Sequence, residues 1–374
     1  MKILLLSAYD AHSHKIWRQG LEAHFPDCQW IQLALPPRHF RWRIRGNSLT
    51  WAFESRDLLC APYDLLIATS MVDLSTLRGL VPQLASLPTA VYFHENQFAY
   101  PPSARQGDSV GPQVLNLYTA LCANRVVFNS EFNRSTFLDG VDELLRRLPD
   151  HVPANVANLL AQRSEVIPVP LADACFQPSS AGDQPFSLLW NHRWEYDKAP
   201  ERLLAALQRF FAARDQDAGP VRVHVVGQQF RRQPAAFKQI RALLEAEGAV
   251  GQWGYVEDLD AYRRLLASSH VVLSTALHDF QGLSVLEAVA GGARPLVPER
   301  QAYPEWFGPE YRYQSDSSQP GLEEQAMADK LLQWEAEFRQ GQWAAAPTIE
   351  ALSWRTLEGH YRNLFERLTV CRSG

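Results

Sequence analysis

The chain is most constrained by a double series of short apolar runs that alternate with stretches of helical periodicity. Apolar runs bounded by turn residues are typical of buried strands, whereas apolar residues recurring every three or four positions are typical of amphipathic helices. Strand and helix in strict alternation favour parallel sheets with right-handed crossovers, because parallel neighbours need a long connection between them. The sequence therefore predicts an α/β fold with two Rossmann-like domains that face each other across a cleft.

The two series place the expected elements as follows. The first predicts strands near Ile3–Leu6, Trp30–Leu33, Leu65–Ala68, Ala90–Phe93, Arg125–Asn129 and Val166–Val169. The second predicts strands near Leu188–Asn191, Val221–Val226, Gln252–Val256, Val271–Ser274 and Pro295–Val297. Helical patterns cover Ser13–His24, Glu201–Ala213, Pro234–Ala246, Leu259–Ala267 and Leu283–Ala290. We expect an N-terminal domain at 1–172, a Pro-, Gly- and Ser-rich linker at 173–185 and a C-terminal domain at 186–351.

Length and composition agree with a two-domain globular protein. A chain of 374 residues exceeds the size at which one core usually divides, and 46% hydrophobic with 21% charged residues excludes a disordered chain. The five cysteines are odd in number and widely spaced, without a paired motif, which argues against a disulfide framework or a zinc site. We expect them to be reduced thiols of the core.

No part of the sequence favours a membrane. The longest apolar run is too short to span a bilayer, and Met1–Leu6 turns polar at Ser7, too early for a signal peptide. We therefore expect a cytoplasmic protein without a membrane partner. The sequence does not predict an oligomeric state.

The segment from Asp279 to Glu287 places two carboxylates around a glycine turn, where a strand is expected to pass into a helix. The backbone N–H groups of Gly282, Leu283 and Ser284 would begin that helix and favour a phosphate. Sugar or ribose hydroxyls are the natural partners of both acids. The simpler alternative makes Asp279 an N-terminal charge and Glu287 a solvated helix residue.

Two basic residues, Arg193 and Lys198, follow the expected strand Leu188–Asn191. On such a loop, two fixed cations can neutralise a diphosphate leaving group. Tyr255 and Val256 stand at the end of the expected strand Gln252–Val256 and are candidates for a nucleotide-base pocket, with core packing as the alternative.

The first domain carries polar residues at three expected strand ends. A run too polar for a core follows one strand and consists of His94, Glu95, Asn96 and Gln97, and Asn129 ends the next strand. Ser13 and His14 follow the first strand. We take them together as an acceptor-side site; a structural role is the alternative for His94.

The net charge of −5 excludes a generally cationic surface, so any attraction to a polyanion must come from a local basic patch. The segment 36–46 contains no acid, and its four arginines are interleaved with aromatic residues: Arg38, Arg41, Trp42, Arg43 and Arg45. This composition suits phosphates and splayed bases. The alternative is a solvated edge with Trp42 and Ile44 turned inward.

These motifs resemble known families. The Asp279–Glu287 pair resembles the acid-x7-acid signature of family 4 retaining glycosyltransferases of GT-B fold, although Asp279-Phe280-Gln281 replaces the usual Glu-Pro-Phe, and Arg193–Lys198 resembles the diphosphate clamp of these enzymes. Within this class, four motifs resemble the tRNA-queuosine α-mannosyltransferase family: Arg41–Arg45, Tyr63–Ser70, His94–Pro101 and Phe128–Ser130. Tyr9–His14 departs from this family, which has a glycine pair before Ser-His.

The resemblance implies transfer of mannose from GDP-mannose to the cyclopentenediol of queuosine at the wobble position of a tRNA, with retention. It implies that Arg193 and Lys198 bind the diphosphate, Asp279 the sugar and Glu287 the ribose, while His94 supports the sugar. It also implies that a C-terminal helix at 352–374 packs back on the first domain and that no metal or other cofactor is needed.

Two other functions stay open. One is a nucleotide-sugar-dependent transferase acting on a glycan, lipid or small metabolite. The other is an inactive tRNA-binding protein on a transferase scaffold. The absence of a basic amphipathic anchor argues against a lipid acceptor, and the presence of Arg193, Lys198 and Glu287 argues against an inactive binder.

Overall fold

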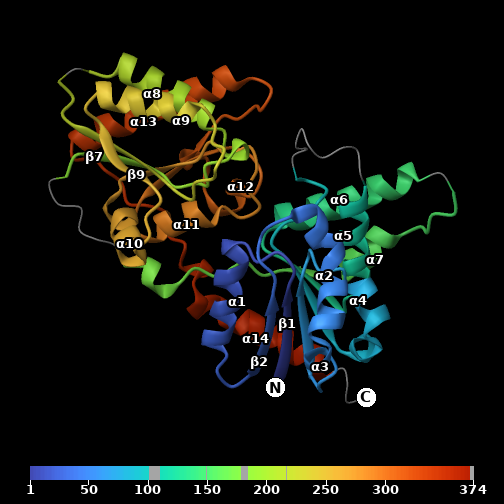
Figure 1. Cartoon of the computed structure of the whole chain (residues 1–374). Helices are drawn as coiled ribbons and strands as arrows, with labels where there is room; N and C mark the ends of the chain where they lie inside the picture. Colours follow the sequence, from blue (N-terminus) through green and yellow to red (C-terminus); the bar gives the residue numbers. More distant parts are fainter. Residues whose placement is uncertain (101–109, 149, 178–183, 216, 371–374) are drawn as a thin grey trace. The chain divides into compact units, whose positions relative to one another are not determined.

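The computed structural model describes residues 1–100, 110–148, 150–177, 184–215 and 217–370. The chain forms two compact units (Figure 1): unit 1 comprises Met1–Pro170 and Trp354–Gly374, and unit 2 comprises Leu171–Ser353. Pro101, part of the predicted linker (178–183) and the end of the predicted C-terminal helix (371–374, with Cys371) lie outside the described residues.

Unit 1 is built on a six-stranded parallel sheet of order β2-β1-β3-β4-β5-β6. Its strands are β1 (Lys2–Ser7), β2 (Gln29–Ala34), β3 (Leu65–Thr69), β4 (Thr89–Phe93), β5 (Arg125–Phe128) and β6 (Ser164–Val166). Its α-helices are α1 (His12–His24), α2 (Phe40–Glu54), α3 (Arg56–Leu59), α4 (Leu74–Leu80), α5 (Gly111–Leu121), α6 (Glu131–Arg147), α7 (Val156–Gln162) and α14 (Trp354–Val370), with a 3₁₀ turn η1 (Pro82–Ser86).

Helices cover both faces of this sheet, because alternate strand residues point to opposite sides. On one face, α2, α4, α5 and α6 share a core with β1, β3, β4 and β5. On the other, α1 and α14 pack together (Figure 1), with Trp17 stacked on Tyr92 at 4.3 Å and Phe25 edge-on to Phe365 at 5.2 Å. The last helix of the chain therefore completes the core of the first unit.

Unit 2 holds a second six-stranded parallel sheet, of order β12-β11-β10-β7-β8-β9. Its strands are β7 (Phe186–Trp190), β8 (Val221–Val226), β9 (Val250–Gly254), β10 (Val271–Leu273), β11 (Arg294–Pro298) and β12 (Arg312–Tyr313). Its α-helices are α8 (Pro200–Ala213), α9 (Ala236–Ala246), α10 (Leu259–Ser268), α11 (Leu283–Ala290), α12 (Tyr303–Trp306) and α13 (Pro320–Arg339); 3₁₀ turns are η2 (Asp173–Cys175), η3 (Tyr196–Lys198), η4 (Pro309–Tyr311) and η5 (Glu350–Leu352).

The helices of unit 2 lie on both faces of its sheet. Helices α8, α9 and α13 share one apolar cluster with the strands, and α10, α11 and α12 share another on the opposite face (Figure 1). Counted within the unit, the strand order is that of a doubly wound dinucleotide-binding sheet, and it reverses between β7 and β10. The loops after these two strands therefore leave the sheet side by side, where such folds bind ligands.

The structure confirms the predicted fold class and places α11 and β8 at the predicted residues. Strand β9 ends two residues earlier than predicted, so Tyr255 and Val256 lie in the following loop. Helix α2 and strand β12 were not predicted, since α2 carries apolar residues on both its faces and β12 is very short. The prediction of core thiols is wrong for Cys60, which is exposed.

No helix within the described ranges is both long and apolar enough to cross a bilayer.

A buried tyrosine joins α14 to the rest of unit 1. The Tyr361 hydroxyl accepts from Trp17 Nε1 at 2.9 Å and donates to the Pro168 carbonyl at 3.0 Å. We expect Tyr361→Phe to lower the free energy of unfolding by about 1–3 kcal/mol, because the Trp17 N–H would remain buried without an acceptor. Urea unfolding measures the change, with the exposed Tyr118→Phe as the matched control. Equal stability of the two variants would contradict this account.

Candidate functional site

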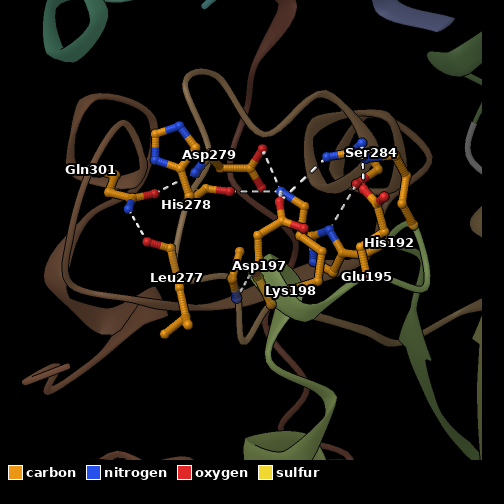
Figure 2. A network of polar contacts seen from close by, with 12 residues as sticks. His192, Glu195, Asp197, Lys198, Leu277, His278, Asp279, Ser284 and Gln301 are labelled. Atoms are coloured by element: carbon orange, nitrogen blue, oxygen red, sulfur yellow. Dashed lines mark hydrogen bonds and ion pairs between the residues drawn. The ribbon is translucent and has the colours of Figure 1, made fainter. Parts of the chain in front are cut away.

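The loops after β7 and β10 are joined by one buried ammonium group. Lys198 Nζ donates to the His278 carbonyl at 2.7 Å and lies 3.2 Å from Asp279 Oδ1 (Figure 2). It also lies 3.5 Å from Asp197 Oδ2. Lys198, predicted from the first loop, and Asp279, predicted from the second, are therefore brought together at the carboxyl edge of the sheet.

One glycine and one buried indole determine the path of the loop after β7. Gly227, at the end of β8, has φ +143°, and a Cβ there would lie 1.9 Å from the His192 carbonyl oxygen. Trp194 is buried and stacks on Phe237 at 4.0 Å. Because Trp194 anchors the middle of the loop, Arg193 and Glu195 on either side of it reach solvent.

Arg193 takes part in a chain of ion pairs. Its Nη1 lies 2.6 Å from Glu195 Oε2, and its Nη2 donates to Asp197 Oδ2 at 3.3 Å. The Arg193 side chain is 45% exposed, whereas that of Asp197 is 3% exposed. Asp197 contacts both predicted cations and thereby fixes their separation, with Arg193 as the outer and Lys198 as the inner charge.

Asp279 is held on several sides. The Tyr303 hydroxyl donates to its Oδ2 at 2.9 Å, and its backbone N–H donates to the Gln301 side-chain oxygen. Gln301 also donates to the Leu277 carbonyl (Figure 2). Burial alone would raise the pKa of Asp279, but Lys198 and other neighbours more than offset it and hold the pKa below its usual value. Asp279 is therefore a fixed carboxylate.

The turn before α11 requires glycine. Gly282 is the N-cap with φ +77°, and a Cβ there would lie 2.8 Å from Tyr303 Cε1. The Asn191 side chain donates to the Ser284 carbonyl at 2.7 Å, which ties the first turn of α11 to the β7 loop. The first turn of α11, which begins at Leu283, is thus tied to the loop that carries the two cations, and its N-terminus adds the positive end of the helix dipole.

Histidine 192 adds no charge to this edge. His192 is buried, and its Nδ1 lies 3.4 Å from Ser284 Oγ. Burial, reinforced by Lys198, lowers the pKa of His192 to about 4. The positive charge of the site at neutral pH therefore comes from Arg193, Lys198 and the helix end.

Glu287 lies in α11 against α10. It is half-buried, and burial raises its pKa to about 7, although Arg263 and a hydrogen bond with Tyr262 oppose the rise. The alternative of a freely solvated helix residue is therefore wrong for Glu287. Near neutral pH the Glu287 carboxyl can either donate or accept a hydrogen bond.

The two base-pocket candidates differ in environment. Tyr255 is 57% exposed, so core packing does not explain it. Val256 is half-buried and packs against the α10–α11 cluster. A purine or pyrimidine ring could stack only on Tyr255 of this pair.

In unit 1, the histidines predicted at two strand ends form a stacked pair. The rings of His14 and His94 lie 4.0 Å apart at an interplanar angle of 21°, and Trp17 meets His94 edge-on at 5.0 Å. Both side chains are buried, and their four ring nitrogens have no hydrogen-bond partner among the described residues. Burial lowers the pKa of both histidines, so they are neutral at pH 7. Ser13, beside them, is half-buried.

The prediction that the run after β4 is too polar for a core is wrong for His94 and Asn96, which are buried. Asn96 accepts from the N–H groups of Phe98 and Ala99, both at 2.9 Å, and donates to Asn133 Oδ1 at 2.9 Å. Asn129 donates to the His94 carbonyl at 2.9 Å. The amides satisfy the loop backbone, which makes their burial favourable.

Asn96 and Asn129 are therefore occupied in shaping the loop. Glu95 and Gln97 on either side of Asn96 are half-buried. Asp10 lies in the loop where the family has a glycine pair. Its Oδ2 lies 2.8 Å from Arg18 Nη2.

The predicted arginine segment lies mostly on α2. Arg38, Arg41 and Arg45 are exposed, and Arg43 is half-buried. Of the two residues that the alternative turned inward, Ile44 is buried but Trp42 is 56% exposed.

Sequence reasoning missed the residues that support the site. These are Tyr303 and Gln301 around Asp279, Asp197 between the cations, and Asn133 in the loop network. Asp197 stands next to Lys198, and Asn133 follows Asn129 by four residues, so their closeness to predicted site residues was a signal in the sequence. Tyr303 and Gln301 come from beyond the next strand, and no local signal marks them.

Comparisons with known proteins agree with this geometry. Residues 2–171 match the family profile described as tRNA-queuosine alpha-mannosyltransferase N-terminal. A Drosophila melanogaster tRNA-queuosine alpha-mannosyltransferase is 31% identical over 327 residues, which are 84% of this chain and 84% of the relative. The chain belongs to the tRNA-queuosine α-mannosyltransferase family.

Solved structures of glycosyltransferases share the fold of this family member. Sucrose-phosphate synthase from Thermosynechococcus elongatus matches with a TM-score of 0.64 at 14% identity, over 99% of this chain and 100% of that one. Anabaena HepE, in complex with UDP, matches with a TM-score of 0.61 at 14% identity, over 98% and 100%. The fold is that of GT-B glycosyltransferases, and the chain is a glycosyltransferase.

The raised pKa of Glu287 predicts a pH-dependent stability. Because the folded pKa of about 7 exceeds the ordinary value of 4.5, ionising Glu287 costs stability as the pH rises from about 4.5 to about 7. Glu287→Gln should therefore gain up to about 3 kcal/mol in free energy of unfolding over the wild type across this window. Denaturant unfolding at pH 5, 6, 7 and 8 measures the difference, with the exposed Glu201→Gln as control. A difference that does not change with pH would refute the raised pKa.

Proposed function

We propose that this glycosyltransferase moves mannose from GDP-mannose to the cyclopentenediol of queuosine at the wobble position of a tRNA, with retention at the anomeric carbon. The observation that carries the proposal is the contact of Lys198 with Asp279 at the reversal of strand order in unit 2. It joins a diphosphate-binding cation to a sugar-binding carboxylate. Membership of the tRNA-queuosine α-mannosyltransferase family supports the donor and the acceptor.

The diphosphate of the donor binds to three positive groups. Arg193 and Lys198 supply full charges, and the N–H groups at Gly282, Leu283 and Ser284 supply the helix end. Each of these groups interacts most strongly when the sugar bond breaks and negative charge builds on GDP.

The two acids bind hydroxyl groups. Asp279, a carboxylate oriented by Tyr303 and Lys198, accepts from hydroxyls of the transferred sugar. Glu287, farther along α11, binds the ribose, and Tyr255 stacks on the guanine ring beside Val256. These are binding roles, unlike the paired proton transfers of a glycosidase.

The chemical step follows from these roles as a front-face substitution. The bond from the anomeric carbon to the leaving phosphate oxygen breaks while the queuosine hydroxyl oxygen forms a bond on the same face. The departing diphosphate accepts the proton of that hydroxyl, so a protein base is not needed. The role expected of His94, support of the sugar, stays a prediction, as do acceptor contacts by Ser13, Glu95 and Gln97.

The tRNA is held through its phosphates by the arginine segment of unit 1. Arg38, Arg41 and Arg45 reach solvent, in a chain whose net charge of −5 provides little other attraction for a polyanion.

Removing either clamp cation should slow turnover while the fold persists. We expect Arg193→Ala and Lys198→Ala each to reduce the single-turnover rate at saturating donor by about 10²–10³, because these groups stabilise charge that develops in the transition state. Arg264→Ala, which removes an exposed helix arginine of the same unit, is the control. A wild-type rate in either clamp variant would exclude the clamp.

The proposed function is tested by incubating the protein with GDP-[14C]mannose and tRNA. Label should enter queuosine-containing tRNA and not queuosine-free tRNA of the same sequence. Transfer to free glycans or metabolites without tRNA would favour the small-acceptor alternative, and tRNA binding without any transfer would favour an inactive binder.

A further inference from the structure

Helix α2 carries large apolar side chains on its solvent side. Trp42 is 56% exposed, Leu49 is 49% exposed and Phe53 is 75% exposed. Their spacings of seven and four residues place them along one face of the helix. The opposite face is buried through Ile44 and Trp51, so α2 is apolar on both sides.

Glycine 46 fixes the indole of Trp42 at one end of this face. A Cβ at Gly46 would lie 2.4 Å from Cε2, 2.5 Å from Cζ2 and 2.8 Å from Cδ2 of Trp42. The indole therefore rests against the helix backbone one turn onward, while more than half of its surface faces solvent. An aromatic ring held in this way loses little freedom when a partner binds.

The charge around this face suits a polyanion. Residues 36–53 contain no aspartate or glutamate, and Arg38, Arg41 and Arg45 of the same segment are exposed. A face that combines fixed cations with an exposed aromatic plane is the pattern that binds unstacked bases together with their phosphates. The short apolar face and the acidic chain as a whole do not suit a lipid surface, which attracts basic helices of low net hydrophobicity through many cations.

We propose that the exposed face of α2, formed by Trp42, Leu49 and Phe53, is a base-stacking surface for unpaired nucleotides of an RNA loop. The inference rests on the proposed function, which makes that loop the anticodon loop of the tRNA acceptor. The eleven residue-to-residue steps from Trp42 to Phe53 cover about 16 Å of helix, enough for more than one base. The arginines bind phosphates, and the apolar face binds the bases between them.

These two contributions respond differently to salt. Phosphate contacts release counterions, so removing arginines flattens the dependence of affinity on salt. Stacking releases none, so removing an apolar side chain should lower affinity by the same factor at every salt concentration. The salt slope therefore separates a base-stacking surface from a purely electrostatic patch.

The experiment measures dissociation constants for queuosine-containing tRNA at several salt concentrations. Trp42→Ala and Phe53→Ser should each raise the constant about 5-fold or more at unchanged slope, since stacking contributes about 5- to 150-fold per base. Arg41→Gln combined with Arg45→Gln should flatten the slope. Binding of GDP-mannose should not change in any variant.

Gly46→Ala is the most specific variant. It keeps every side chain of the surface, and alanine favours a helix interior over glycine, but its methyl group displaces the indole of Trp42. We expect weaker tRNA binding than wild type with an unchanged or higher melting temperature. Tyr118→Ala, which removes an exposed aromatic ring from α5, is the matched control.

The outcomes are separable. If the double arginine variant weakens binding while Trp42→Ala and Gly46→Ala stay within twofold of wild type, the stacking surface is overturned and the tRNA acceptor stands. If wild-type protein binds no tRNA, the proposed function fails and the stacking surface with it. Binding of wild type to anionic vesicles but not to RNA would likewise overturn the inference.

Discussion

The geometry of unit 2 depends on the burial of one ammonium group. The Lys198 side chain is 8% exposed and is surrounded by the His278 carbonyl and the carboxylates of Asp197 and Asp279. A charge in such a place is tolerated only when it is paired and hydrogen-bonded. The loops after β7 and β10 lead into α8 and α11. They are held together because the buried Lys198 ammonium and the Asp279 carboxylate each require the opposite charge of the other.

The two cations of this edge are built for different tasks. Lys198 is held in place by the His278 carbonyl and by the carboxylates of Asp197 and Asp279. Arg193 is nearly half exposed and pairs with Glu195, which is 33% exposed, and such pairs contribute little net stability. A phosphate can therefore draw Arg193 away from Glu195 at small cost, whereas Lys198 would meet a phosphate from the position in which Asp197 and Asp279 hold it.

Much of the fold and part of the site could be predicted from the sequence. Strand and helix periodicity located the two sheets, and strand-end positions located Lys198 and Asp279, because the carboxyl ends of parallel strands gather at one edge. Periodicity could not predict α2, because Trp42 and Phe53 place apolar groups on the solvent side of the helix, where an amphipathic pattern requires polar residues. It also could not show that Asn96 is buried. That burial depends on hydrogen bonds of Asn96 with Asn133 and with the Phe98 backbone N–H, which form only in the folded structure. The same limit hides Tyr303, which reaches Asp279 from another element.

The packing of α14 determines the order in which the two units can finish folding. Trp17 and Tyr361, joined at the heart of unit 1, are separated by 344 positions, and the whole of unit 2 lies between them. Leu171 and Ser353, where unit 2 begins and ends, lie side by side in a parallel bridge, so unit 2 has the topology of a domain inserted into unit 1. During synthesis, unit 2 is complete before α14 leaves the ribosome, whereas unit 1 keeps the part of its apolar sheet face that α14 covers open until that helix is made. The later-made unit is therefore the first to finish folding, which reverses the usual N-terminal-first order of multidomain proteins.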